Sequence, residues 1–564
     1  MKRFILASVS AVALLSAPSA FAADANSAVA DFGKVSTVDQ AGNSNTAVVT
    51  QKYATQRSAI EQDGNNNSAT VNQGSGNTAI TLGNNNNSTV QQTSLTSRGN
   101  TADVTMFSNN STSAVTQSGN NLAIVRQGAL QNHGPATNGQ SSVVNQSNAG
   151  TNGVAPTYNQ ATVDQNGNGN ASTVNQNGDQ NWAKTNQTIG TVLSTSTTAQ
   201  TGKRNFADVY QQGGTSASTV TQTGDDNVAD LVQQNGDNTS TILQSGNLND
   251  AVVSQDGDDN VSHVTQNGNG NATGSVSGSP YQNQTSITPA SVGVKQKGNG
   301  NTSDVVQTGG ATGTVTQTGN LNRSNLGQAA GASATVSQTG DANTSDVAQG
   351  AGASASVSQT GNTNNADVDQ AAGASAAVNQ TGDTNNALVN QLSDSDAFVD
   401  QVGNNNGATV QQAAGSAGST AEIDQIGNLN VASISQNGAT NSASTRQEGD
   451  SNASTVIQNG AGNASTIATK GNGNRADVTQ AGSAISSVAQ TGNDNRATVS
   501  QGFDAYSNLV QDGNLNIASV TQAAGAYSDV LQDGDSNKAT VTQNAAAFSD
   551  VNQVGNNNTS TISQ

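Results

Sequence analysis

The sequence contains no cysteine, so neither a disulfide framework nor a thiolate metal site is available to stabilise the fold. Aromatic residues make up only 3% of the chain and hydrophobic residues 32%, which is too little for an ordinary globular core. Charged residues are also scarce, at 10%, whereas disordered chains are typically rich in charge. These shortages together predict a fold that is held mainly by backbone pairing.

Apolar runs are short, and the one that matters lies at the start of the chain. Lys2 and Arg3 supply positive charge, residues 4–15 are mostly apolar, and Ala20-Phe21-Ala22 matches a small-x-small cleavage site. No later segment approaches the roughly 20 consecutive apolar residues of a transmembrane helix. We therefore expect a signal peptide at 1–22, a short N-terminal segment at 23–33, and an exported chain that does not insert into a membrane.

The remaining polar residues exclude other classes of function. The formal net charge of −20 opposes binding to nucleic acid, whose phosphates would repel the chain. The two histidines, His133 and His263, lie far apart in a sequence without cysteine, which leaves almost nothing from which to build a catalytic triad or a zinc site. The Gly-x-Gly-x-Asn runs lack the lysine of a phosphate-binding loop, so we interpret them as turns. The sequence predicts a protein that is not an enzyme and that binds no cofactor or metal.

What the chain does contain is an internal repeat. From residue 484 to 564, glutamines recur every 21 residues in two series, and asparagines recur with the same step in a third. Elsewhere the halves of the repeat become equal, and asparagines recur every 11 residues, as at Asn227, Asn238 and Asn249. We predict that one set of these amides forms a structural ladder: Gln490, Asn495, Gln501, Gln511, Asn516, Gln522, Gln532, Asn537, Gln543, Gln553, Asn558 and Gln564.

Each half of the repeat alternates with the period of two that is typical of a strand. Gly, Asn and Asp between the halves supply the positive φ values that tight turns need. The pattern predicts two strands per turn, with each residue lying above its equivalent 21 or 22 positions earlier. In 495–501, one face would carry Asn495, Ala497, Val499 and Gln501, and the other Arg496, Thr498 and Ser500.

In-register stacking accounts for the composition. Small Ala and Ser with one larger apolar residue per strand can fill a thin interior, and stacked amides can bond to their copies on neighbouring turns. A buried amide left unpaired costs about 1–3 kcal/mol, so such a ladder must be nearly continuous. We predict an all-β, two-stranded-per-turn β-solenoid of the cross-β type, with about 25 turns over residues 34–564.

Prolines mark the places where the register slips, because proline cannot donate to a central strand. We expect less regular rungs at about residues 93–215 and 272–292, which contain Pro135, Pro156, Pro280 and Pro289.

The repeats resemble those of curlin subunits, which follow the pattern S-x5-Q-x-G-x-G-N-x-A-x3-Q. The segment 216–233 has this spacing except for Asp226 at the second glycine, and 165–170 and 296–301 match the central Q-x-G-x-G-N. The residues of 216–233 that match are Ser216, Gln222, Gly224, Asn227, Ala229 and Gln233.

The resemblance implies a secreted structural subunit that self-assembles into extracellular curli-like amyloid fibres on a Gram-negative bacterium, in biofilm matrix and surface adhesion. It also implies export through the periplasm and an outer-membrane pore, and a curli-type nucleator as partner. Two departures are the many repeats and the short segment 23–33, which is shorter than the family's usual export leader.

An alternative function is an ice- or carbohydrate-binding β-solenoid that uses outward Ser and Thr columns. One such pair of columns would run along Thr498 and Ser500, Ser519 and Thr521, Thr540 and Thr542, then Thr561 and Ser563. The columns would not extend far, because the equivalent positions are Asp477 and Thr479 upstream and Asp367 and Asp369 in the earlier block. Outward aspartates 21 residues apart, Asp346 with Asp367 and Asp529 with Asp550, should stack; we interpret them as charges that slow premature aggregation, with cation binding as the alternative.

Two features near residue 564 suggest assembly surfaces. The last strand, 558–564, reads as a complete rung rather than an atypical cap, and an open strand edge can template another chain. Beside it, Ile485, Tyr506, Tyr527 and Phe548 recur every 21 residues and should form an outward apolar column, which would either support lateral contact between filaments or stabilise a single rod.

Overall fold

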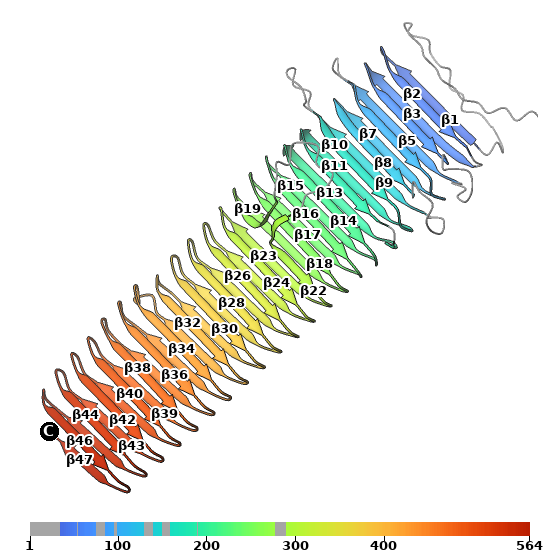
Figure 1. Cartoon of the computed structure of the whole chain (residues 1–564). Coiled ribbons are helices and arrows are strands. Elements are labelled where there is room, and N and C mark those ends of the chain that lie inside the picture. Colours follow the sequence, from blue (N-terminus) through green and yellow to red (C-terminus); the bar gives the residue numbers. More distant parts are fainter. Residues whose placement is uncertain are drawn as a thin grey trace, which may run out of the picture. The chain divides into compact units, whose positions relative to one another are not determined.

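The computed structural model describes residues 34–52, 55–74, 85–94, 99–128, 139–148, 158–188, 190–276 and 289–564. The predicted signal peptide, the segment 23–33 and the prolines Pro135, Pro156 and Pro280 lie outside the described residues. The chain divides into two units, residues 1–299 and 300–564. Both units share one architecture, in which successive strands alternate between two parallel sheets, and Figure 1 shows the strands of each unit stacked in chain order.

The first unit contains β1 to β22. Its odd-numbered strands form one sheet: β1 (Lys34–Ala41), β3 (Gln56–Gly64), β5 (Asn87–Ser94), β7 (Thr112–Ser118), β9 (Ser141–Ser147), β11 (Ala171–Asp179), β13 (Thr195–Lys203), β15 (Ala217–Thr223), β17 (Thr239–Ser245) and β19 (Val261–Asn267). The even-numbered strands form the other, joined by β21: β2 (Thr46–Gln51), β4 (Ser68–Gln73), β6 (Thr101–Met106), β8 (Asn121–Gln127), β10 (Asn159–Gln165), β12 (Trp182–Gln187), β14 (Phe206–Gln212), β16 (Val228–Gln234), β18 (Asp250–Asp256), β20 (Ala272–Val276), β21 (Pro289–Val292) and β22 (Val294–Lys297).

The second unit contains β23 to β47. Its odd sheet comprises β23 (Thr302–Thr308), β25 (Arg323–Gln328), β27 (Thr344–Gln349), β29 (Asn365–Gln370), β31 (Asn386–Gln391), β33 (Gly407–Gln412), β35 (Val431–Gln436), β37 (Ala453–Gln458), β39 (Arg475–Gln480), β41 (Arg496–Gln501), β43 (Ile517–Gln522), β45 (Lys538–Gln543) and β47 (Thr559–Ser563). Its even sheet comprises β24 (Thr312–Thr318), β26 (Ser333–Thr339), β28 (Ser354–Thr360), β30 (Ser375–Thr381), β32 (Asp396–Val402), β34 (Thr420–Ile426), β36 (Ser442–Glu448), β38 (Ala464–Lys470), β40 (Ile485–Thr491), β42 (Tyr506–Asp512), β44 (Tyr527–Asp533) and β46 (Phe548–Val554).

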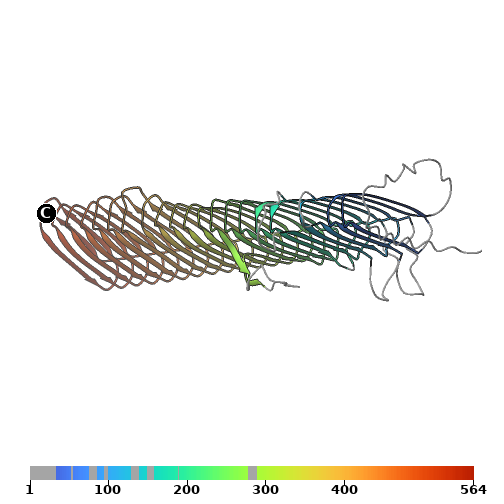
Figure 2. The same ribbon diagram turned by 90° about the horizontal axis from the view of Figure 1, so that it is seen from above.

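One odd and one even strand make each turn of the solenoid, and Figure 2 shows the two layers of strands within each unit. Neighbouring strands of a sheet pair in parallel with the expected step, so Gln501 lies opposite Gln522, and in the first unit Val228 lies opposite Asp250. The structure has about 22 turns, close to the expected 25, and confirms the predicted all-β solenoid. Among the described residues, no helix is long and apolar enough to cross a membrane.

The steps between paired residues lengthen in parts of the first unit. Gln127 lies opposite Gln165 and Ser147 opposite Asn177, so the parallel register is kept while extra residues enter the connections. Near residue 272 the pattern changes in another way. Asp250 and Ala251 of β18 pair with the first residues of β20, while later residues of β18 pair with β22, and β20 pairs with β21 in the antiparallel direction.

The core lies between the two sheets and is filled by the inward residues of every strand. In β41 and β43 these include Ala497 and Val499, then Ala518 and Val520, all at most 1% exposed. The inward position that holds Ala in these odd strands holds Ser in the neighbouring even strands, for example Ser528 in β44. The layer is thin, so small residues with one Val, Leu or Ile per strand are enough to close it.

Candidate functional site: amide ladders and outer faces

Glutamines at the ends of the strands form ladders along the stacking direction of the second unit. Each Nε2 donates to the Oε1 of the glutamine one turn later, at 2.7 Å from Gln490 to Gln511 and 2.8 Å from Gln511 to Gln532. In the odd sheet such bonds run through every inward glutamine from Gln307 to Gln564, with distances up to 3.5 Å at the last step. These ladders join the turns through side chains as well as through the backbone.

The second hydrogen of each amide crosses the core. Gln511 in the even sheet donates to the carbonyl oxygen of Arg496 in the odd sheet at 3.1 Å, and Gln501 in the odd sheet donates to that of Ile485 at 2.8 Å. One glutamine therefore bonds the turn before it, the turn after it and the opposite sheet. Since these groups are buried, losing any one of the three partners leaves a polar atom unpaired, at about 1–3 kcal/mol.

The asparagines bond in a different way from the glutamines. The backbone N–H of Asn516 donates to Oδ1 of Asn495 at 2.9 Å, and Nδ2 of Asn495 donates to the carbonyl oxygen of Gly513 at 2.7 Å. The expected amide-to-amide bond appears beside this only at some steps, as from Asn558 to Asn537 at 3.0 Å. Asparagine, whose side chain is one carbon shorter than that of glutamine, mainly fastens the backbone of each turn to that of the next.

The twelve residues of the predicted ladder lie in the strands or turns of the second unit from β40 onward. All of them except the last two are buried. Asn558 is half-buried and Gln564 is exposed.

The glutamine ladder of the even sheet has one break in the second unit. Bonds run from Gln317 to Gln447 and again from Gln490 to Gln553. Between them the position belongs to Thr469, which pairs with both Gln447 and Gln490 in the backbone register. Within the described residues, neither Thr469 Oγ1 nor Gln490 Oε1 has a hydrogen-bond partner, because the threonine side chain is too short to reach either neighbour.

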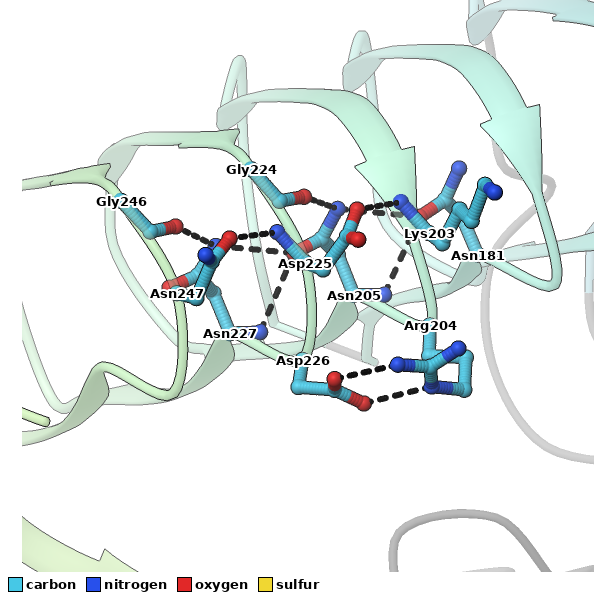
Figure 3. Close-up of polar contacts among 10 residues, drawn as sticks. All are labelled: Asn181, Lys203, Arg204, Asn205, Gly224, Asp225, Asp226, Asn227, Gly246 and Asn247. Atoms are coloured by element: carbon cyan, nitrogen blue, oxygen red, sulfur yellow. Dashed lines mark hydrogen bonds and ion pairs between the residues drawn. The ribbon is translucent and has the colours of Figure 1, made fainter. Parts of the chain in front are cut away.

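The turns of the first unit show how the repeat motif works (Figure 3). Gly224 has φ +113°, and a Cβ there would lie 2.0 Å from the carbonyl oxygen of Gly246 one turn later, so only glycine fits. Asn205 Nδ2 donates to the Gly224 carbonyl at 2.8 Å, and the backbone N–H of Lys203 donates to Oδ1 of Asp225 at 2.8 Å.

The residue after Asp225 occupies the left-handed region. It is Asp226, with φ +60°, where the curlin pattern has its second glycine. Its carboxylate accepts two hydrogen bonds from the Arg204 guanidinium, with Arg204 at the equivalent position one turn earlier. The position thus tolerates other residues, because only its φ is special and no neighbouring backbone excludes its side chain.

The outer face of the even sheet from β40 to β46 carries the predicted apolar column. The rings of Tyr506 and Tyr527 stack with centroids 4.7 Å apart, and those of Tyr527 and Phe548 with centroids 5.1 Å apart. Phe548 is 63% exposed. Burial, followed by Tyr506, Asp529 and Asp550, raises the pKa of Tyr527 above its usual value.

Hydroxyl columns occur on both outer faces of the second unit. Thr498 and Ser500 and their equivalents point outward from the odd sheet, as predicted. A larger array, which the sequence argument missed, lies on the even sheet over β24, β26 and β28. The signal was visible as Ser or Thr at every second position of three successive strands: Thr312, Thr314, Thr316 and Thr318; Ser333, Thr335, Ser337 and Thr339; Ser354, Ser356, Ser358 and Thr360.

Acidic residues stack on the outer faces as expected. Asp346 lies opposite Asp367, and Asp529 opposite Asp550. Burial, with Asp369 and Asp346 as further causes, raises the pKa of Asp367. Over the part of the chain that the structure describes, no group of three or more His, Cys, Asp or Glu residues is placed to hold a metal ion.

A second acidic cluster lies in the first unit at outward positions of the even sheet that are nevertheless buried. Asp208 is 7% exposed and Asp230 4%, beside the apolar cluster of Phe206 and Val228. Burial, followed by the neighbouring Asp208, raises the pKa of Asp230 to about 7, although Lys184 lowers it. Sequence alternation alone assigned such positions to solvent, so this burial was not predicted.

The histidines do not come together into a site. His263 is exposed on β19, and His133 lies outside the described residues.

The comparison with protein families identifies the repeat. Four segments match the curlin associated repeat, at residues 224–257, 236–268, 417–449 and 449–482. The first of these contains the Gly224 turn and the buried amides around it. No curated protein matches the chain.

Proposed function

We propose that this curlin-family protein is a secreted structural subunit that self-assembles into extracellular curli-like amyloid fibres, in biofilm matrix and surface adhesion. The observation that carries the proposal is the in-register stacking of equivalent turns. Every turn offers the next a row of backbone N–H and C=O groups together with glutamine and asparagine amides. A turn of a second copy presents the same groups, so the bonds that join turns within one chain suit contact between chains.

The partners and location in this proposal follow from the same resemblance. The main partner is another copy of the chain, because the subunit forms a homopolymer. A curli-type nucleator and an outer-membrane export pore are the further partners. Export through the periplasm to the surface of a Gram-negative bacterium agrees with the positive start and short apolar run of residues 1–22. Curlin-repeat proteins are structural, and the stacked outer aspartates act here as charges that slow premature association.

Fibre diffraction and electron microscopy of the purified chain test the proposal. We expect fibres with reflections at about 4.8 Å and about 10 Å, the two spacings of cross-β structure. Chains that stay dispersed for weeks and give no cross-β reflection would contradict it.

The contribution of the glutamine ladder to assembly is tested by two matched double variants. Replacing Gln511 and Gln532 with Ala removes buried bonds, so we expect assembly to slow markedly. Replacing Asn508 and Asp529 with Ala removes one outward bond of 3.0 Å and should have a small effect. Equal aggregation half-times for the two variants would show that the ladder has no special part in assembly.

A second candidate function, binding to ice or carbohydrate, is favoured by the hydroxyl array on β24, β26 and β28. Over these three strands every outward residue is Ser or Thr and none is charged. Hydroxyls spaced by about 4.8 Å between strands and about 7 Å along them form a regular lattice that can order water or contact sugars. Strong freezing hysteresis by the unassembled chain, lost in Thr335→Lys but kept in Thr498→Lys, would support this function over the fibre.

A further inference from the structure

The two outer faces of the solenoid from β40 to β46 carry opposite charge. On the even sheet the charged outward residues are all aspartates: Asp512, Asp529, Asp533 and Asp550. On the odd sheet, over β41, β43 and β45, they are Arg496 and Lys538, both exposed. Neither Arg496 nor Lys538 forms an ion pair with any described residue. At its outward strand positions the region therefore has one acidic face and one basic face, and the connecting turns add Asp494, Asp504 and Asp535 along the edges.

The basic residues and two of the aspartates lie along the same edge of the solenoid. A four-residue turn joins the end of each even strand to the start of the next odd strand, so Asp533 at the end of β44 and Lys538 at the start of β45 are near one edge on opposite faces. By the same reasoning Arg496, at the start of β41, shares that edge with Asp512, at the end of β42.

This arrangement defines how a second copy would fit. If the copy is displaced along the sheet normal without rotation, its even face meets the odd face of the first. Its Asp512 and Asp533 then lie opposite Arg496 and Lys538, within about half of the 4.8 Å step between turns. Because both copies have the same step, the match holds for both charge pairs at once.

The opposite edge matches in shape. There the small column of Ser500, Thr521 and Thr542 meets the bulky column of Tyr506, Tyr527 and Phe548. Contact on this edge covers exposed aromatic surface, which is typical of interaction sites on soluble proteins.

Other orientations are disfavoured by charge. Two even faces in contact would bring aspartates together, and two odd faces would bring Arg496 and Lys538 near their own copies; juxtaposed like charges cost several kcal/mol. The complementary region begins at β40. One turn earlier Lys470 would lie opposite Arg475, which is already bonded to Asp477 at 2.8 Å.

We propose that a second copy of this chain docks laterally, with its acidic aromatic face on the basic hydroxyl face of the first. The proposal deepens the proposed fibre function by assigning the contact between neighbouring filaments. The contact is heterologous, so each copy keeps one face free for a further copy, and filaments stack in open layers.

Charge exchange in the full chain tests the proposal. One variant carries Arg496→Asp and Lys538→Asp, and the other carries Asp512→Lys and Asp533→Lys. In each variant alone, positions 512 and 533 of the even face carry the same sign of charge as positions 496 and 538 of the odd face, so we expect about tenfold fewer side-by-side filaments in electron micrographs. An equimolar mixture should restore stacking, because these positions of one variant then meet residues of opposite charge in the other. The control for the first variant, Lys295→Asp with Arg323→Asp, makes the same change in net charge outside the region and should stack like the parent.

The outcomes separate this inference from the fibre function. Fibres that stack equally well in all variants, or a mixture that fails to restore stacking, would overturn the lateral contact and leave the fibre intact. If the parent forms no fibres, the fibre function fails, and the cross-section of the unassembled chain from small-angle scattering decides the lateral contact. A thickness that doubles in the parent and in the mixture, but in neither variant alone, supports the contact; an unchanged thickness refutes it.

Discussion

Replacing Thr469 with Gln should repair the break in the even-sheet ladder. The position lies between Gln447 and Gln490, whose nearest ladder bonds on the far sides are 2.8 and 2.7 Å long. A glutamine there gains an amide bond from Gln447 of about 1 kcal/mol, gives Gln490 Oε1 a donor, which is worth about 1–3 kcal/mol, and removes the unpaired Thr469 hydroxyl, which is worth about 1 kcal/mol. Ordering the longer side chain costs about 2 kcal/mol. The net expectation is a stabilisation of about 1–3 kcal/mol.

Hydrogen exchange of β36, β38 and β40 is the suitable assay, because arrays of repeats need not unfold in a single step. Protection in these strands should rise about tenfold or more, since each factor of ten corresponds to about 1.4 kcal/mol. The matched control is Thr466→Gln, which places the same residue on the exposed side of β38. The reciprocal change Gln511→Thr should open a new gap and lower protection. If Thr469→Gln protects no better than Thr466→Gln, ladder continuity does not stabilise the stack.

Three further changes probe the turns, the core and the buried acids. Gly513→Ala places a Cβ 2.2 Å from a carbonyl oxygen of the next turn at φ +118°, so hydrogen exchange of β42 and β44 should show a loss of about 3 kcal/mol or more. Gly407→Ala meets nothing within 4 Å and should be neutral in the exchange of β33. Ser528→Ala removes a buried hydroxyl that has no partner among the described residues, and hydrogen exchange of β44 should show a gain of about 1 kcal/mol. Asp230 has a folded-state pKa of about 7 against an unfolded value near 3.9, so its folded form binds the extra proton and stability is lost as the pH rises from about 4 to above 7. Asp230→Asn should therefore exceed the parent by up to about 4 kcal/mol at pH 8 and match it at pH 4 in hydrogen exchange of β16.

The fold could be predicted from the sequence because every turn stacks its residues on the equivalent residues of the turn before it. Residues that stack on their own equivalents recur at a fixed step, so the spacing of Gln501, Gln522 and Gln543 gave the register directly, and alternation within each strand separated Val499 from Thr498. The turn at Gly224 was also predicted from the sequence. Its positive φ and the close approach of the next turn both require a glycine there.

Other features depend on the length of a side chain or on which residues cover a surface. The spacing of residues in the sequence does not reveal either of these. The asparagines bond to backbone groups because their side chains are short, although their period equals that of the glutamines. Leu515 adopts φ +60°, a conformation that costs a non-glycine residue about 1–2 kcal/mol. It is held there by neighbouring turns, since its N–H donates to the carbonyl oxygen of Asn493 at 2.9 Å. Asp230 alternates like an outward residue, yet it is buried.

Growth along the stack and association across it depend on separate sets of residues. Inward amides such as Gln511 bond to the turns before and after them and across the core to the opposite sheet, so they favour addition along the stacking direction and do not reach the outer faces. Outward residues such as Arg496 and Asp533 form no part of the ladders, so their charge governs only which faces meet. In a globular core the two roles would be mixed, because a residue there contacts unlike neighbours on all sides. Here alternate residues of each strand point inward and outward, so the two roles belong to different side chains. We therefore expect Gln511→Ala to slow elongation and leave lateral stacking intact. Arg496→Asp with Lys538→Asp should reduce lateral stacking and leave elongation unchanged.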